Sequence, residues 1–373
     1  MRVGRWLALV VLSLPLAGCA VTPRYGRPGT PLERLGDEIV VCGRLFHSGA
    51  PVVLWTDPGG YDAYRVERHF EPHEIMPRNP VSTQPARYGS WRRRLPDEIL
   101  ERVQAEGWTL PLLAEYVDQF VLHYDVCGTS RRCFKVLHDL RGLSVHFMLD
   151  LDGTIYQTLD LKERAWHAGS ANDRSVGVEI ANIGAYEDPK KLDEWYARDT
   201  AGRVFATFPD WYGETGLRSR DFAARPARNE LICGEVQGKE LCQYDLTDRQ
   251  YDSLIKLTAT LCRVLPRIRP DYPRAADGAL RSGVLSDDEM EAFRGILGHY
   301  HVTKVKIDPG PALDWDRLIR GVRRITTSSP TLSGAPPATD AAERSDRTLL
   351  ETALARASRP RSAPRGSARR RSC

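Results

Sequence analysis

The sequence lacks any apolar run long enough to cross a membrane as a helix, which takes about 20 residues. The longest candidate, residues 6–17, is too short and is interrupted by Pro15. Net charge is also small, because 53 Lys and Arg oppose 49 Asp and Glu. Residues 327–373 hold nine arginines against two aspartates and two glutamates, which gives this segment a net charge of +5. Because the whole chain has a net charge of +4, the remaining residues have a net charge of −1. The sequence therefore predicts no transmembrane helix and a nearly neutral body.

The first residues are typical of a secretory signal. A basic start, residues 1–5, precedes the apolar run, and Leu-Ala-Gly-Cys at 16–19 resembles a bacterial lipoprotein box. Cys19 would then become the acylated N-terminus and anchor the protein to a membrane. Ala20 favours the outer membrane, facing the periplasm. The alternative is an ordinary cleaved signal with a coincidental cysteine. For an exported chain we expect no nucleic-acid partner, and we expect a monomer.

Eight cysteines agree with export into an oxidising compartment. Without Cys19 and the terminal Cys373, six remain, which allow 15 pairings. Short spacing favours Cys127 with Cys133 and Cys233 with Cys242, which leaves Cys42 with Cys262. The alternative is that some of them are buried thiols.

Composition divides the chain into five parts. They are a signal segment (1–19), a tether (20–36), a β-rich N-terminal extension (37–95), an α/β domain (96–325) with an insertion at 185–245, and a basic tail (326–373). The tail is rich in Ser, Pro, Ala and Arg and poor in aliphatic residues, so we expect disorder. It would bind acidic wall polymers or lipid headgroups, or simply be solvated.

The α/β domain has an alternating strand and helix pattern. Strands are expected at 120–124, 144–150, 154–159 and 175–182, and helices at 96–119, 247–265 and 286–297. This pattern indicates a central mixed β-sheet flanked by helices. Residues 185–245 show no clear period and are expected to be irregular.

Five residues in separate segments carry the chemistry: His123, Glu179, His299, Lys306 and Asp308. Two histidines and one carboxylate are the ligand number that a catalytic zinc uses when its fourth position stays open. A glutamate and a lysine remain to transfer protons and stabilise charge. The set indicates a metal-assisted hydrolase.

The blocks that hold these residues come in a family's order. They are FVLHYDV, RGLSVHFMLDLDGTIYQTLDLKERAWHAG, SVGVEIAN, LTDRQYDSLIKLTATLC and GHYHVTKVKIDPGPALDW. Over residues 115–320 the chain resembles the zinc-dependent N-acetylmuramoyl-L-alanine amidases of the amidase_2 family, which share their fold with peptidoglycan recognition proteins. The resemblance implies hydrolysis of the amide between N-acetylmuramic acid and L-Ala, with peptidoglycan or muropeptides as partners. With the lipoprotein box, it implies an outer-membrane-anchored amidase of cell-wall degradation.

The resemblance also assigns roles. His123, His299 and Asp308 would hold one zinc ion per chain, which lowers the pKa of water and polarises the scissile carbonyl. Glu179 would transfer the proton, and Lys306 would stabilise the oxyanion.

Other residues in the same blocks are weaker candidates. Contacts with substrate are expected from Tyr124, His146, Trp166, His167 and Asn182. His146 and His167 would line the substrate groove or orient other groups by hydrogen bonds, with a structural role as the alternative, and packing is the alternative for Trp166. His138 is expected on a helix surface, and His301 is not expected to be a ligand.

Two other functions compete with the amidase. One is a non-catalytic peptidoglycan-binding lipoprotein, although such proteins typically lack a metal ligand. The other is a zinc hydrolase of the same fold that acts on another amide.

Overall fold

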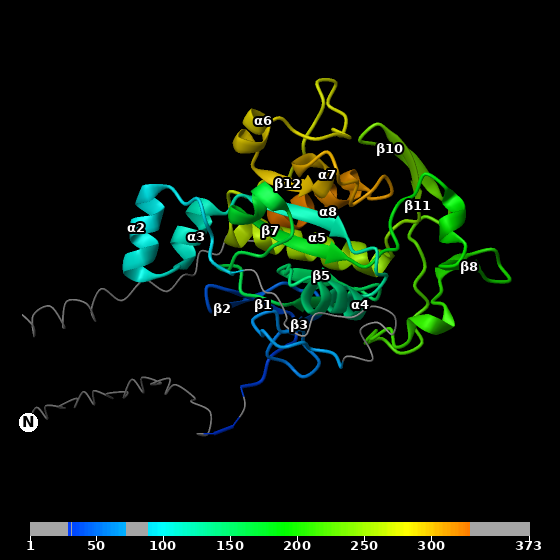
Figure 1. Ribbon diagram of the computed structural model, residues 1–373, viewed down its shortest axis with the longest axis horizontal. Helices are drawn as coiled ribbons and strands as arrows, with labels where there is room; N and C mark the ends of the chain where they lie inside the picture. Colours follow the sequence, from blue (N-terminus) through cyan, green and yellow to red (C-terminus); the bar gives the residue numbers. More distant parts are fainter. Residues whose placement is uncertain (1–28, 31, 72–88, 329–373) are drawn as a thin grey trace, which may run out of the picture.

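A computed structural model describes residues 29–30, 32–71 and 89–328 (Figure 1). The predicted signal segment, Cys19 and nearly all of the predicted tail lie outside these residues. Within them, no helix has both the length and the apolar character that a membrane crossing requires.

The centre of the fold is a six-stranded mixed sheet with the order β12-β4-β7-β5-β6-β3. Its strands are β3 (Val52–Leu54), β4 (Gln119–Tyr124), β5 (Phe147–Leu149), β6 (Ile155–Gln157), β7 (Ser175–Ile180) and β12 (Gly295–Gly298). Within this sheet only β5 and β6 pair antiparallel, and the other neighbours run parallel. With helices on its faces, the sheet confirms the predicted fold class.

Two long helices cover one face of the sheet. Helix α5 (Asp248–Val264) begins with a capping box in which the side chains of Thr247 and Gln250 bind each other's backbone N–H groups. It packs against α8 (Trp315–Ser328), and the leucines of α5 join one apolar cluster with Phe120, Leu122 and Tyr124 of β4. Because side chains alternate along a strand, Val121 and His123 point to the opposite face.

That opposite face is only partly covered. Helix α4 (Ser130–Phe134) and the π-helix η1 (Lys135–Leu140) lie toward β5 and β6, where Phe134 packs with Met148 and Tyr156. The 3-10 helix η2 (Gly169–Asp173) lies toward β12 and β4, where Ala171 packs with Val121 and Leu297. His123 and Glu179 lie on strands between these two apolar clusters.

Shorter helices complete the domain. They are α2 (Asp97–Glu106), α3 (Leu110–Tyr116), α6 (Asp287–Ala292) and α7 (His299–Val302). Figure 1 shows α2 and α3 at the side of the molecule opposite the green insertion that contains β8, β10 and β11.

The N-terminal region is β-rich, as predicted. Strands β1 (Glu38–Val41) and β2 (Arg44–His47) form a hairpin, and β3 extends the central sheet by pairing with β6. Within the predicted extension, residues 63–70 form no strand. The extension therefore contributes an edge strand to the sheet of the α/β domain.

The helix predicted over 286–297 is wrong at its end. It stops at Ala292, and β12 follows as a buried parallel strand beside β4. Gly295 has a φ of 149°, and a Cβ there would lie 2.7 Å from the Asp271 carbonyl oxygen. A run of four small and apolar residues has no period that separates strand from helix, which explains the error.

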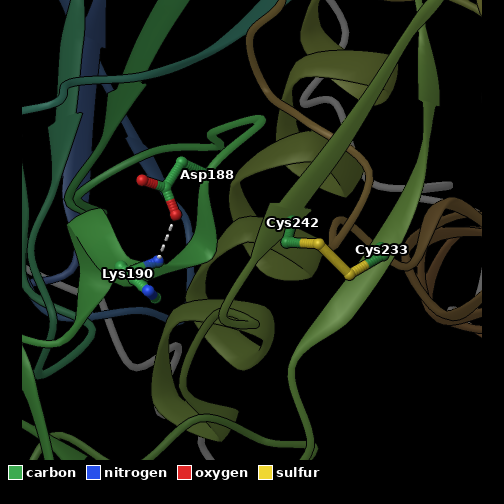
Figure 2. The surroundings of a disulfide bond; sticks show 4 residues. All are labelled: Asp188, Lys190, Cys233 and Cys242. Carbon is green, nitrogen blue, oxygen red and sulfur yellow. Dashed lines mark hydrogen bonds between the residues drawn. A yellow bond between two sulfur atoms is a disulfide. The ribbon is translucent and has the colours of Figure 1, made fainter.

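The insertion is more regular than expected. It contains the hairpins β8 (Tyr196–Arg198) with β9 (Val204–Ala206) and β10 (Ile232–Val236) with β11 (Lys239–Gln243), and the 3-10 helices η3 (Pro189–Leu192) and η4 (Asp210–Tyr212). Cys233 and Cys242 lie opposite each other on β10 and β11 and form the predicted disulfide (Figure 2).

The other predicted disulfides are not formed. Cys127 and Cys133 are free thiols, as are Cys42 and Cys262. Between Cys127 and Cys133 the chain makes a turn that Asp125 caps and then starts α4, so a short spacing does not bring the two sulfur atoms together.

Candidate metal centre and active site

His123 and Glu179 lie side by side on adjacent parallel strands. The register of β4 and β7 pairs them directly, so both side chains point to the same face of the sheet. His123 is 1% exposed and Glu179 is 9% exposed. The sheet therefore fixes these two groups rigidly, beneath the gap between the two apolar clusters.

His299 and Asp308 reach the same place from the neighbouring edge. His299 is the first residue after β12, which runs parallel to β4, so it emerges beside His123. The loop carrying Asp308 is tied back because the Tyr300 N–H donates to the Asp308 carbonyl oxygen at 3.1 Å. His299 and Asp308 thus become direct neighbours of His123, although they follow it in the sequence by 176 and 185 positions.

Three donor atoms converge. His123 Nδ1 lies 3.0 Å from His299 Nδ1 and 2.9 Å from Asp308 Oδ2, and His299 Nδ1 lies 2.9 Å from the same oxygen. In a tetrahedral zinc site the ligand atoms lie roughly 3.3 Å apart, given bonds of about 2.0–2.1 Å. Two imidazole nitrogens and one carboxylate oxygen at nearly this spacing fit a zinc ion.

The protonation of these groups also suits a metal. Burial, followed by the nearby His299, lowers the pKa of His123 to about 4, so its imidazole is neutral at pH 7. Burial alone would raise the pKa of Asp308, but hydrogen bonds with His123 and His299 outweigh it and hold that pKa below its usual value. Neutral imidazoles and an ionised carboxylate are the forms that coordinate metals.

His167 holds His123 from behind. With Nδ1 facing the other two donors, His123 carries its proton on Nε2, which lies 3.0 Å from His167 Nδ1. His167 Nε2 in turn lies 3.3 Å from Ser175 Oγ. Burial, and then the nearby His123, lowers the pKa of His167. His167 is therefore a neutral ring whose Nδ1 accepts the hydrogen bond from His123 Nε2. Such a partner fixes the tautomer and orientation of a ligand histidine.

Glu179 is a buried carboxyl group with a raised pKa. Burial is the main cause, and the charges of Asp308 and Asp125 add to it, while Lys306 and Arg141 oppose it. A carboxyl group whose pKa is moved toward neutrality can both accept and return a proton.

A cavity of about 450 Å³ opens beside these groups. Its lining includes Arg141, Trp166, His167, His299, Thr303 and Lys306. Arg141 follows η1 and was not singled out in the sequence, although it lies within a matching block. The cavity thus carries two cations near the buried carboxyl of Glu179.

The remaining candidates have other contacts. Tyr124 faces away from the cavity and packs against Gly184. Asn182 is buried: its backbone N–H donates to Asp125, and its side-chain Nδ2 donates to the Tyr244 carbonyl oxygen. Trp166 lines the cavity and lies under the Arg164 guanidinium, 4.1 Å from its ring centre.

Three further histidines serve the fold. His146 Nδ1 accepts from the Gly177 N–H, and its Nε2 donates to the Glu163 carbonyl oxygen. His301 likewise bonds the backbone through both ring nitrogens. The surface position expected for His138 is wrong, because this ring is 1% exposed and lies 2.5 Å from Asp139 Oδ1.

The hairpin β10–β11 braces both segments that carry His299 and Asp308. Beside its disulfide, Gln243 Nε2 donates to the Pro309 carbonyl oxygen at 3.2 Å and Gln243 Oε1 accepts from the Ala312 N–H at 3.1 Å. At its tip, Gln237 Nε2 donates to the Tyr300 carbonyl oxygen at 2.7 Å. Figure 2 shows the disulfide joining the two strands of this hairpin. Sequence reasoning missed both glutamines, which are unremarkable in any local pattern.

The comparisons with known proteins agree with this geometry. The family model described as "Amidase_2: N-acetylmuramoyl-L-alanine amidase" matches residues 113–311, more than half of the chain. A curated relative is the 1,6-anhydro-N-acetylmuramyl-L-alanine amidase AmpD of Haemophilus influenzae, 23% identical over 51% of this chain. The chain matches 64% of that relative's length, which is less than two thirds.

Solved structures give weaker likenesses. The amidase AmiD of E. coli, in complex with anhydro-N-acetylmuramic acid-L-Ala-D-gamma-Glu-L-Lys, has a TM-score of 0.31 and 17% identity, over 61% of each chain. The Drosophila peptidoglycan recognition protein SA has a TM-score of 0.26 and 15% identity, over 53% of this chain and 75% of its own. Scores this low carry no argument about function.

Proposed function

Because the chain belongs to the Amidase_2 family, we propose that it is a zinc-dependent N-acetylmuramoyl-L-alanine amidase. Its substrates would be peptidoglycan or muropeptides, and the bond cleaved would be the amide between the lactyl group of N-acetylmuramic acid and L-Ala. The observation that carries the proposal is the convergence of His123, His299 and Asp308 within 3.0 Å, with Glu179 on the adjacent strand.

His123, His299 and Asp308 would hold one zinc ion. When bound, zinc lowers the pKa of water and polarises a carbonyl group. Glu179 would accept the proton of the attacking water and pass it to the departing amine of L-Ala. Lys306, which lines the same cavity as His299, would stabilise the negative charge that develops on the carbonyl oxygen.

Arg141 would bind a substrate carboxylate. It shares the cavity with Lys306, and the stem peptide of peptidoglycan carries carboxylates that a guanidinium recognises through paired hydrogen bonds.

We further propose that the protein is exported, cleaved before Cys19, acylated there, and held at the outer membrane facing the periplasm as a monomer. The lipoprotein box at residues 16–19 supports the anchor, and the disulfide of the β10–β11 hairpin is in keeping with an oxidising compartment.

Product analysis of purified muropeptides tests the activity. We expect the zinc-loaded protein to release stem peptide with a free L-Ala amino terminus. Glu179→Gln keeps the shape of the side chain but cannot act as a base, so we expect a rate at least about 100-fold lower with unchanged zinc content. Glu187→Gln, on an exposed residue, is the matched control.

Intact muropeptide despite bound zinc would contradict the amidase. Binding without cleavage would favour a peptidoglycan-binding lipoprotein, and cleavage of simple acyl-amino-acid amides alone would favour another amide substrate.

A further inference from the structure

A second cavity lies beside the first. It has a volume of about 270 Å³, and its lining includes Tyr64, Ser90, Trp91, Gly142, Leu143 and Ser144. Leu143 lines both cavities. Trp166 of the first cavity also bonds two residues of the second: its indole Nε1 donates to the Gly89 carbonyl oxygen at 2.9 Å, and its backbone N–H donates to Ser144 Oγ at 3.1 Å. The two cavities are therefore neighbours that share a boundary at Leu143 and Trp166.

Trp91 is an exposed ring on a fixed backbone. Trp91 is 75% exposed, but the residues on both sides are anchored. The Ser90 carbonyl oxygen accepts from the Arg164 N–H at 2.6 Å. The buried Arg92 guanidinium donates to the carbonyl oxygens of Leu161 and Asp173 at 2.7 and 2.6 Å. A platform that is already ordered loses little conformational entropy when it binds a ligand.

The two cavities differ in charge. The first carries Arg141 and Lys306, whereas the described residues that line the second include no charged side chain. The two cations of the first cavity would therefore bind the carboxylates of a stem peptide. The second, with the exposed rings of Trp91 and Tyr64, suits an uncharged ligand with a flat apolar face and peripheral hydroxyl or amide groups, which is the chemistry of a sugar ring.

We propose that the second cavity is a subsite for an uncharged N-acetylhexosamine linked to the muramoyl residue, with Trp91 as its stacking platform. The proposal rests on the proposed amidase function and adds a substrate preference. The protein would act on stem peptides still attached to a glycan better than on peptides that carry a lone muramic acid. Tyr64, Ser90 and Trp91 lie outside residues 113–311, which match the family.

Two substrates with the same stem peptide test the preference, one carrying N-acetylmuramic acid alone and the other the N-acetylglucosaminyl disaccharide. The zinc-loaded full-length protein should show a kcat/KM about tenfold higher for the disaccharide, the factor that an aromatic contact of typical strength supplies. Trp91→Ala should reduce this ratio to near one. Trp211→Ala, on another exposed tryptophan that lines neither cavity, should keep the wild-type ratio.

Equal rates on both substrates would overturn the subsite and leave the amidase intact. So would a preference that survives Trp91→Ala, or a Trp91→Ala defect that follows stem-peptide length instead of sugar number. If neither substrate is cleaved, the amidase fails. Calorimetric binding of the peptide-free disaccharide, compared between wild type and Trp91→Ala, then decides the subsite separately: equal binding, or none, overturns it.

Discussion

At the scale of single residues, Asp125 is a carboxyl group with unusual surroundings, outside the three donors His123, His299 and Asp308. It directly follows β4, and its Oδ1 accepts N–H groups from Cys127, Gly128 and Asn182. Its Oδ2 is buried and has no hydrogen-bond partner. Burial raises the pKa of Asp125 to about 7, against the effect of these backbone N–H groups. The fold therefore favours the protonated, neutral form of the Asp125 carboxyl group over the ionised form.

This arrangement predicts a pH-dependent stability. In the unfolded chain the carboxyl group has a pKa near 3.9, so the folded state holds the proton more tightly. The free energy of unfolding should then fall as the pH rises from about 4 to about 7. Asp125→Asn keeps the accepting oxygen and removes the charge. We expect it to be more stable than wild type by roughly 1–3 kcal/mol at pH 8, with a much smaller difference at pH 5.

Urea unfolding of the chelator-treated protein at pH 5 and pH 8 measures both differences. A gain of the same size at both values would mean that the charge of Asp125 is not what destabilises the fold.

At the scale of elements, the sequence predicted those parts whose signal is local. Leucines spaced three and four apart, with Thr247 and Asp248 as the expected cap, identified α5, and alternating apolar residues identified β7. The convergence of His123, His299 and Asp308 was predictable because all three lie in family blocks. Strand β12 was missed because four small and apolar residues have no period.

The hairpin contacts were missed for a different reason. Gln237 and Tyr300 are 63 positions apart, and Gln243 and Pro309 are 66 apart. A contact between such distant polar groups leaves no mark on local composition. His167, by contrast, was a candidate from the sequence, and its hydrogen bond with His123 is one of the roles expected for it.

The hairpin should matter for metal binding. Gln243 bonds both sides of the loop after Asp308 through Pro309 and Ala312, so Gln243→Ala would free that ligand segment. We expect zinc affinity to fall about tenfold, in the range found when groups that orient metal ligands are removed. Competition with a chromophoric chelator measures it, independently of catalysis.

Glu240→Gln, on an exposed residue of the same hairpin, serves as the control. An unchanged zinc affinity in Gln243→Ala, with the fold intact by circular dichroism, would show that the loop holds Asp308 without help.

At the scale of the whole molecule, the proposed catalytic groups all precede helix α8 in the sequence. Helix α8 runs to Ser328, two residues beyond the predicted start of the tail, and packs against α5. A deletion meant to test the tail should therefore begin at residue 329.

We expect removal of residues 329–373 to leave kcat/KM on soluble muropeptide within about twofold of wild type, because none of the residues proposed to act on the substrate lies there. The same deletion should weaken binding to intact, anionic cell wall, since the segment after Ser328 holds nine arginines and only four acidic residues. Sedimentation with insoluble wall, at low and high salt, measures this. A large loss on the soluble substrate would place part of the active site in the tail.

The bridge between Cys233 and Cys242 has a consequence for the order of maturation. Disulfides persist in oxidising compartments and are rare in the cytosol, so a newly made chain would first hold the hairpin by backbone hydrogen bonds alone. Gln237 and Gln243, which bond the segments of His299 and Asp308, would be held most firmly once the disulfide has formed. If the chain is exported as proposed, zinc would be held most tightly after it had reached the compartment of the proposed substrate.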